Sequence, residues 1–469
     1  MYVFGVQVVI INLSKFVNMS KFKQILKISV IAAVILLFSC NKVEEVDATY
    51  KATQFSHEIA TSWVDLSFDL VRTTPGYSPP VASKTYGLLG ITLYESVVQG
   101  MPGYQSLSGQ VTELPEMPVA NKNKLYYWPI CANVAAYDLL VNLFPTANAD
   151  MKKVMLLTYE NNLKKNSADL DAAIIAQSID FGKEVAKRIY FWSATDAIAN
   201  EAYLKNFPSS FVVPTGDGLW VSTNPSNARP LQPFWGKTRS FVPNITAEVT
   251  IPAHPAFSLD INSKFYESAY QVYEAVNGLT PEQERIAKYW ADDAGLSFTP
   301  PGHVMSVASQ VVKEQKLDLG RSAEAFARVG MCVGDAFVCC WKTKFEHNLL
   351  RPVTYIQKYI DPTWRTILST PPFPAYTSGH ASCSGAGFDM LTKLFGANYA
   401  FVDKSHILKF TQGEPNFEPR SFASFKAAAG EAAISRLYGG IHYEFDNFEG
   451  LKSGEAVSER NYSKIITKK

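Results

Sequence analysis

The segment 321–343, RSAEAFARVGMCVGDAFVCCWKT, is apolar on most of its helical faces beyond the first turns. A helix that is apolar all round has to be enclosed by other elements, because no side of it is suited to water. This segment therefore favours a large fold in which further helices surround a central one. Hydrophobic residues make up 47% of the 469 residues, which is enough to bury such a core.

Helical patterns continue along most of the chain, and strand patterns are few. Each predicted helix is bounded by proline, glycine or a capping residue. The predicted helices cover 54–72, 81–99, 123–144, 149–163, 168–193, 281–293, 303–315, 321–343, 379–395 and 420–438. The stretch 205–258 is rich in Pro, Gly, Asn and Trp, which indicates an ordered functional or wrapping loop. No repeat or composition break divides 56–469, so we expect a single all-α domain there.

Charge and cysteine content exclude several classes of protein. The 44 Lys and Arg residues nearly balance the 43 Asp and Glu residues, so the sequence offers no broad basic field for nucleic acid. The six cysteines lack C-x-x-C spacing, which indicates neither a zinc site nor a disulfide framework. One or two disulfide bridges are an alternative if the protein lies in an oxidising compartment. For Cys332, Cys339 and Cys340 we favour the role of small buried apolar side chains.

The N-terminal segment has the pattern of a secretory signal. Three lysines between positions 21 and 27 precede an apolar run, 29–39, that is too short to span a bilayer. We therefore expect residues 1–39 to be a signal peptide. Met19 begins a compact basic head and is an alternative start to the first methionine.

The apolar run ends in LFSC, which resembles the lipobox of bacterial lipoproteins. This resemblance implies that Cys40 becomes the lipidated first residue, followed by a polar tether over 40–55. We then expect an exported bacterial cell-envelope lipoprotein, at the outer membrane or the periplasmic face, attached to the membrane through Cys40. An uncleaved anchor and an ordinary buried cysteine are the alternatives.

Two basic residues lie on either side of a predicted helix end in the segment KFEHNLLRP. Lys344 follows the buried helix directly, and Arg351 comes seven positions later. Pro352 disfavours helical geometry at the residue before it. The two cations can therefore converge on one point from different backbone directions.

Two further segments, TSGHA and SRLYGGIH, add anion-binding groups. Ser378, Gly379 and His380 lie at the start of a predicted helix, where main-chain N–H groups and the positive end of the helix dipole favour an anion. Arg436 and His442 would point roughly 120° apart on a continuous helix, and the Gly-Gly pair between them lets both face one point. Together with the first segment, these groups suit one small oxyanion that carries several charges, such as phosphate.

The segments KFEHNLLRP, TSGHA and SRLYGGIHYEFD resemble the three signature segments of the superfamily of vanadium-dependent haloperoxidases and type 2 phosphatidic acid phosphatases. The haloperoxidase branch is resembled further by Trp341, by FPAY from Phe373, and by YWADDAGLSFTPPGH at 289–303. The resemblance covers most of 280–450. Thr377 departs from the proline usual in the family, and we expect this threonine to cap the helix instead.

The resemblance implies an all-α helical-bundle domain of the vanadium haloperoxidase and acid phosphatase type, with vanadate as the cofactor. Its implied cofactor-binding residues are Lys344, Arg351, Ser378, Gly379, His380, Arg436 and His442. His442 would be the metal ligand through a neutral imidazole nitrogen.

The implied catalytic residues are His380, Lys344 and Asp293. His380 would be the acid–base residue. Asp293 would hold the second arginine of the site, with Asp292 as the alternative. The pocket for halide would include Trp341 and Phe373.

The function that the resemblance implies is oxidation of halide by hydrogen peroxide to hypohalous acid or its equivalent. Iodide or bromide is favoured, and an organic acceptor is an open question. Vanadate mimics the five-coordinate geometry of phosphoryl transfer, so an exported acid phosphatase with His442 as nucleophile is an alternative. A non-catalytic surface lipoprotein that keeps the fold is a third.

Overall fold

The central element is the helix α11, Leu319–His347, which is buried along most of its length. Asp318 caps its start by accepting a hydrogen bond from the main-chain N–H of Arg321, and the helix ends where Asn348 adopts a left-handed conformation at φ 47°. The sequence predicted a buried helix over 321–343, and that prediction is confirmed. The helix continues past the predicted end, which places Lys344 in its last turn.

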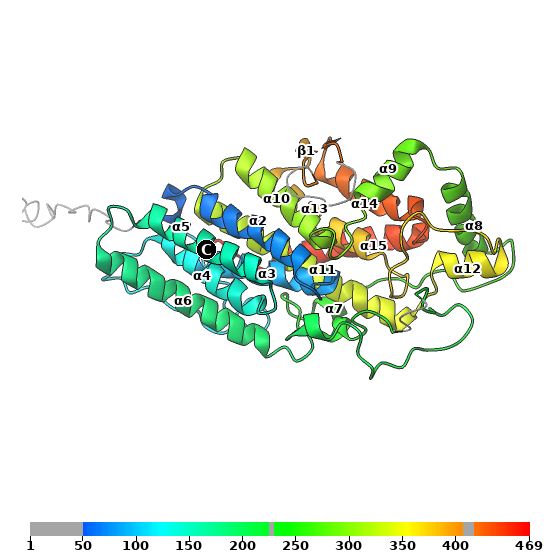
Figure 1. The fold of residues 1–469 in the computed structure, drawn as a ribbon, viewed down its shortest axis with the longest axis horizontal. Helices are drawn as coiled ribbons and strands as arrows, with labels where there is room; N and C mark the ends of the chain where they lie inside the picture. Colours follow the sequence, from blue (N-terminus) through cyan, green and yellow to red (C-terminus); the bar gives the residue numbers. More distant parts are fainter. Residues whose placement is uncertain (1–49, 225–228, 407–416) are drawn as a thin grey trace, which may run out of the picture. The chain divides into compact units, whose positions relative to one another are not determined.

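Helix α11 packs against α3, Pro79–Val97, at a contact made of small residues. A Cβ atom on Gly90 would lie 2.4 Å from the carbonyl oxygen of Phe326, and one on Gly330 would lie 2.7 Å from that of Tyr86. These distances are far below a normal contact, so only glycine lets the two backbones approach this closely. In Figure 1 the two helices run through the middle of the bundle.

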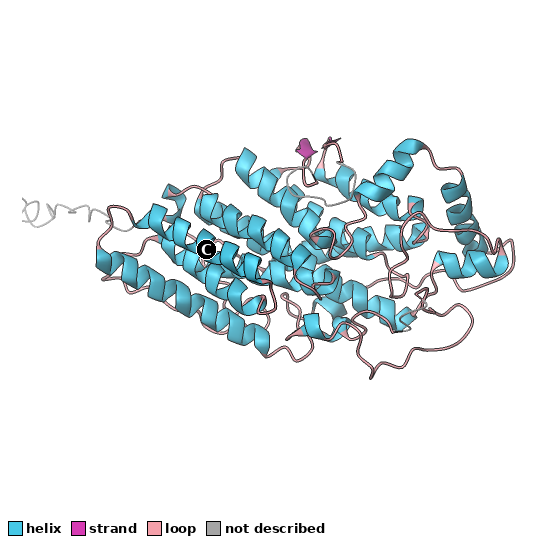
Figure 2. Cartoon of the chain, viewed as in Figure 1, coloured by secondary structure: helices cyan, strands magenta, loops and turns pink. Residues whose placement is uncertain are grey.

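The structure, a computed structural model, describes residues 50–224, 229–406 and 417–469. Almost all of its regular elements are helices, as Figure 2 shows. The remaining α-helices are α2 Glu58–Thr73, α4 Trp128–Leu143, α5 Ala149–Ser167, α6 Ala172–Ala194, α7 Ile245–Glu248, α8 Lys264–Asn277, α9 Pro281–Tyr289, α10 Thr299–Glu314, α12 Pro352–Tyr359, α13 Gly379–Phe395, α14 Phe425–Tyr438 and α15 Glu444–Lys464. Short 3-10 helices are Ala52–Gln54, Val98–Gly100, Ala202–Leu204 and Trp235–Lys237. The all-α prediction is confirmed.

One small sheet joins β1, Phe401–Asp403, to β2, Arg420–Phe422. The strands are antiparallel, with Phe401 opposite Phe422. The helix predicted over 420–438 was therefore wrong at its start, because residues 420–422 pair as a strand and α14 begins five residues later. The elements α7, α8, α12 and α15 were not among the predicted helices.

Helix α11 connects the two halves of the described chain. It contacts α2 and α3 from the N-terminal half, and α13 and α15 from the C-terminal half. In Figure 1, α2 to α6 lie together in blue to green, and α13 to α15 lie on the other side of α11 in yellow to red. The described residues belong to one compact unit. Lys344, in the last turn of α11, is fully buried.

The described parts of the proline-rich stretch, residues 205–224 and 229–258, contact the loops at the end of α11. The N–H of Trp220 donates to the carbonyl of Asn348 at 2.7 Å, and the N–H of Leu231 donates to that of Pro372 at 2.8 Å. Trp220 is fully buried. These two described parts therefore hold in place the loops that carry the C-terminal motifs.

The N-terminal expectations lie largely outside the described residues, which begin at Tyr50. The signal peptide, the Cys40 anchor and most of the tether fall there. The last residues of the expected tether belong to the packed body: Ala52 is fully buried, and the indole N–H of Trp128 donates to the carbonyl of Tyr50 at 2.6 Å. In the described ranges, no helix combines the length and the apolar character needed to cross a membrane.

The five cysteines in the described residues are free and buried. They include Cys332, Cys339 and Cys340, all within α11, in keeping with the role predicted for them.

Candidate active site

The two basic residues of the first motif are held by main-chain carbonyl groups. Lys344 Nζ donates to the carbonyl oxygens of Pro374 and Ala375, each at 2.8 Å. Arg351 is the extended residue before α12, and its Nε donates to the carbonyl of Phe373 at 2.8 Å. One loop therefore gathers both cations and supplies dipoles to them, but no negative charge.

The buried cations lack a full counter-charge. Burial is the main cause that lowers the pKa of Lys344 to about 7, and the charge of Arg351 adds to it. Burial likewise lowers the pKa of Arg351 to about 10. The Nη2 atom of Arg351 is buried and has no hydrogen-bond partner among the described residues. A buried donor of this kind is costly unless an acceptor reaches it, so the site is suited to an anion.

His442 lies between α14 and α15, after the Gly-Gly break, and its hydrogen bonds fix its tautomer. Its Nδ1 is 2.8 Å from Asp446 Oδ2, and its Nε2 is 3.0 Å from Arg351 Nη1. Arginine can only donate, so Nε2 accepts and the ring proton is on Nδ1. Burial, and then the charges of Arg351 and Lys344, hold the pKa of His442 well below its usual value. The ring is therefore neutral and carries its lone pair on Nε2.

The break before His442 depends on glycine. Helix α14 ends at Tyr438, and Gly440 has a φ of 77°, which side-chain-bearing residues rarely adopt. The chain can then turn, so that His442 lines the pocket while Arg436 on α14 does not line it but lies near enough for its charge to act on His442.

Ser378 caps the start of α13 and ties this helix to α15. Its Oγ accepts from the N–H of Ala381 at 3.4 Å, and its own N–H donates to the carbonyl of Asp446 at 3.0 Å. The expectation that Thr377 caps the helix was wrong, because that hydroxyl lies 3.4 Å from Ser382 Oγ instead. Capping falls to the next residue.

His380, in the first turn of α13, carries a buried ring nitrogen without a partner. Its Nε2 forms no hydrogen bond within the described chain. Burial, and then the charge of Arg436, hold the pKa of His380 well below its usual value. The ring is therefore neutral near pH 7, and its Nε2 is free to contact a bound group.

Arg436 lies near both candidate aspartates. Its Nη2 donates to the carbonyl of Ala287 at 3.1 Å. Burial lowers the pKa of Arg436 to about 10, and the charges of Asp292 and then Asp293 act in the opposite direction. Asp292 is buried, whereas Asp293 is exposed. The charge of Asp292, which was the alternative to Asp293, thus acts more strongly than that of Asp293 on the pKa of Arg436.

A pocket of about 320 Å³ lies beside these groups, although Lys344, Arg351, Ser378 and Arg436 are not among the residues that line it. Its walls include the predicted residues Gly379, His380, His442, Trp341, Phe373, Asp292 and Asp293. The rings of Trp341 and Phe373 lie 4.9 Å apart between centroids. Lys344 Nζ and Arg351 Cζ lie 5.1 and 4.9 Å from the centre of the Phe373 ring. The aromatic wall therefore stands directly against the cations.

Several functional positions were not found from the sequence. Asp446 lies within the quoted segment SRLYGGIHYEFD, yet its role was missed; the signal was its position four residues after His442. Other wall residues lie within the family-like segments without having been singled out, namely Ala291, Ala294, Pro300 and Ile441. The rest of the wall comes from segments that carry no motif, namely Ser78, Pro79, Leu231, Phe337 and residues 369–372.

Comparison with known proteins places this chain in a family. A crystal structure described as the first bacterial vanadium-dependent iodoperoxidase is 31% identical, with a TM-score of 0.79, and the match covers 88% of this chain and 97% of that one. The chain belongs to the vanadium haloperoxidase family. Residues 324–468 also match the family described as the VCPO second helical-bundle domain.

Other members of the vanadium haloperoxidase family are more distant. The vanadium chloroperoxidase of Curvularia inaequalis is 27% identical over 278 residues, which is 46% of each chain, so the match spans about half of that relative. An apo-type bacterial vanadium-dependent chloroperoxidase has a TM-score of 0.62 at 14% identity and shares the fold, with 84% of this chain and 94% of that one covered.

Proposed function

We propose that this chain is a vanadate-dependent haloperoxidase, which oxidises halide with hydrogen peroxide. The observation that carries the proposal is the state of His442: a neutral imidazole with its lone pair on Nε2, beside Arg351 and on the wall of a cationic pocket. A lone pair on a fixed nitrogen is what a metal ligand requires. The similarity to an iodoperoxidase supports the same assignment.

The residues present fit vanadate. The unpartnered Nη2 of Arg351 and the remaining N–H of Lys344 are donors for its oxygen atoms, and His442 Nε2 is the ligand for its metal. Ser378, the Gly379 N–H and Arg436 complete the set that would hold it. Bound vanadate would supply a Lewis-acidic centre that activates hydrogen peroxide toward halide.

The chain's own residues would bind, orient and move protons. His380, neutral and with an unpartnered Nε2, accepts a proton from hydrogen peroxide and returns it to the oxygen that leaves as water. Lys344, Arg351 and Arg436 keep positive charge at the oxyanion. The overall reaction takes halide, peroxide and one proton to hypohalous acid and water. Iodide or bromide is the favoured halide, oxidised beside Trp341 and Phe373.

The test uses purified protein prepared without vanadium, with iodide oxidation followed with and without added orthovanadate. We expect activity only when orthovanadate is added. His442→Ala should abolish it, whereas His380→Ala should retain vanadate binding and lose about 10²–10⁴-fold in rate. His347→Ala, a half-buried histidine three residues after Lys344, is the matched control and should keep its activity.

The same assay distinguishes the alternatives. The anion site and the His442 lone pair would also serve an acid phosphatase, with Nε2 as the nucleophile on phosphorus. Hydrolysis of a phosphate monoester that orthovanadate only inhibits, with no halide oxidation, would replace the proposal by that function. Binding of orthovanadate without either activity would indicate a non-catalytic surface protein.

A further inference from the structure

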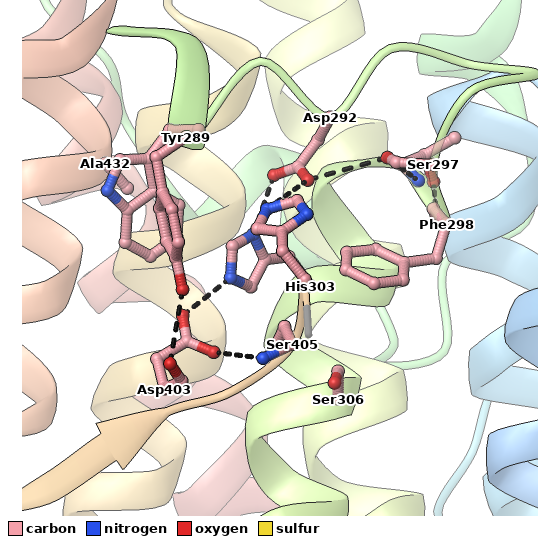
Figure 3. A network of polar contacts seen from close by, with 12 residues as sticks. Tyr289, Asp292, Ser297, Phe298, His303, Ser306, Asp403, Ser405 and Ala432 are labelled. Atoms are coloured by element: carbon pink, nitrogen blue, oxygen red, sulfur yellow. Dashed lines mark hydrogen bonds and ion pairs between the residues drawn. The ribbon is translucent and has the colours of Figure 1, made fainter. Parts of the chain in front are cut away.

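A row of three buried ionisable side chains lies behind the pocket. His303, in the first turns of α10, is fully buried. Its Nδ1 is 2.8 Å from Asp292 Oδ2, and its Nε2 is 2.7 Å from Asp403 Oδ2. Figure 3 shows the imidazole between the two carboxylates, one from the loop after α9 and the other from β1. Both ring nitrogens are therefore engaged by acids that are far apart in the sequence.

This geometry defines the protonation state of the ring. A neutral imidazole would direct one nitrogen lone pair at a carboxylate oxygen less than 3 Å away, which is repulsive. With a proton on each nitrogen, both contacts become charge-assisted hydrogen bonds. The indole of Trp290 also stacks on the ring at 4.4 Å between centroids and 22° between planes, which favours a cation.

The surrounding groups agree with a cation here. Burial alone would lower the pKa of His303, but the charges and hydrogen bonds of Asp292 and Asp403 outweigh it and raise that pKa to about 10. The remaining groups are His406, whose Nε2 lies 3.7 Å from Asp292 Oδ1, and Tyr289, whose ring centre lies 5.7 Å from that of His303. Neither supplies a competing positive charge, because burial lowers the pKa of His406 and raises that of Tyr289.

A metal ion is a poorer account of the same cluster. Asp292, His303 and His406 each bring a possible ligand atom within 4.8 Å of the others. A metal needs a lone pair on His303, however, and both of its nitrogens already donate to carboxylates. The distance of 2.8 Å between His303 Nδ1 and Asp292 Oδ2 is that of a hydrogen bond.

Asp292 connects this row to the active site. It lines the pocket, and its charge raises the pKa values of both Arg436 and His380 against the effect of burial. Burial would raise the pKa of Asp292 itself, but the charge and hydrogen bond of His303 outweigh it, so the carboxylate stays ionised. Without that partner, a buried carboxylate would gain from taking up a proton.

We propose that His303 is a positioning residue: an imidazolium that Asp403 orients from behind and that holds Asp292 ionised and fixed beside Arg436 and His380. The inference rests on the proposed function, because the proposed function assigns Arg436 and His380 to an oxyanion site. It extends that site by two residues, His303 and Asp403, which touch neither cofactor nor substrate.

The first test is spectroscopic and needs no activity. In proton NMR spectra of the vanadium-free protein, the two ring N–H groups of His303 should give downfield resonances that persist at pH 8. They should vanish in His303→Gln and titrate at a lower pH in Asp403→Asn. Absence of these resonances from the wild-type spectrum at pH 8 would overturn the proposal. Loss of the resonances on addition of Zn²⁺, with tight binding of the zinc ion, would overturn it as well.

The second test measures binding of orthovanadate by calorimetry. His303→Gln should weaken binding about 10–100-fold, the effect usual for residues that orient a ligand. Asp403→Asn is isosteric and remote from the pocket, so this variant should stay folded even if His303→Gln does not. It should also weaken the binding of orthovanadate. His347→Gln is the control and should leave the resonances and the affinity unchanged. Wild-type affinity in a folded Asp403→Asn protein would overturn the proposal, whatever the outcome of the halide assay.

Discussion

Asp446 accepts the Nδ1 proton of His442 at 2.8 Å, one helical turn further along the chain. The main-chain carbonyl of Asp446 also accepts a hydrogen bond from the N–H of Ser378. Asp446 therefore both orients the His442 ring and holds the start of α13 in position. Asp446→Asn should keep the fold and the tautomer of His442, which Arg351 still fixes through Nε2, but it replaces a charged acceptor of the Nδ1 proton by a neutral amide and so weakens the orientation of the ring. We expect orthovanadate affinity to fall about 10–100-fold, measured by calorimetry. Asp150→Asn, on the exposed side of α5, should have no effect.

The pKa of Lys344 predicts how anion binding varies with pH. In the vanadium-free protein this pKa is about 7, and a bound anion raises it by favouring the charged amine. Binding above pH 7 should therefore take up a proton, and the affinity should fall by up to about tenfold per pH unit as the pH rises. Sulfate is a suitable probe because its charge is constant over this range. Lys344→Gln should bind weakly, and a pH dependence that survives in this variant would contradict the assignment.

The row Asp292, His303, Asp403 should also affect stability. The pKa of His303 is raised from 6.5 to about 10, so its contribution is fully present below pH 6.5 and is lost as the pH rises through about 10. One proton gives a slope of at most about 1.4 kcal/mol per pH unit. Other groups titrate in the same range, so the quantity to measure is the difference in unfolding free energy between wild type and His303→Gln. That difference should shrink between pH 7 and 10, and a constant difference would argue against a buried imidazolium.

The contact between α3 and α11 gives a prediction about packing. Gly90→Ala brings a Cβ atom to 2.4 Å from the backbone of Phe326, which cannot move without displacing α11. We expect a loss of about 1–3 kcal/mol in unfolding free energy, measured by denaturant titration. Gly430→Ala, at a helical glycine with nothing within 4 Å, is the control and should gain about 0.5–1 kcal/mol. Equal effects of the two substitutions would mean that the helices are less close than described.

The proposal for the N-terminus depends on the sequence alone. If Cys40 is lipidated, the mature protein should fractionate with cell-envelope membranes and carry the mass of an acylated cysteine. Cys40→Ala should release it into the soluble fraction. A wild-type protein that is wholly soluble and unmodified would exclude the lipoprotein assignment and leave the enzyme assignment untouched.

Much of the fold and of the oxyanion site could be predicted because the signals are local. The apolar character of 321–343 on most of its faces located α11, and the motifs around Lys344, His380 and His442 each lie within a few residues. Helix α15 was missed because its hydrophobic face is weak: the residues that it buries are largely Gly, Ser and Asn, which pack against α13. The partnership of His303 with Asp403 spans 100 residues, and no periodicity encodes a contact of that kind.

The pocket wall has a consequence for how such a protein can diversify. All of the groups proposed to hold the oxyanion lie between residues 344 and 442, whereas Ser78, Pro79 and Leu231 add wall from elsewhere in the chain. Substitutions at those three positions change the pocket wall without replacing a cation or a histidine of the proposed site. For the proposed haloperoxidase, changes there would alter the preference among halides or acceptors and leave the groups that hold the oxyanion in place, so a directed-evolution library for new acceptors should begin there.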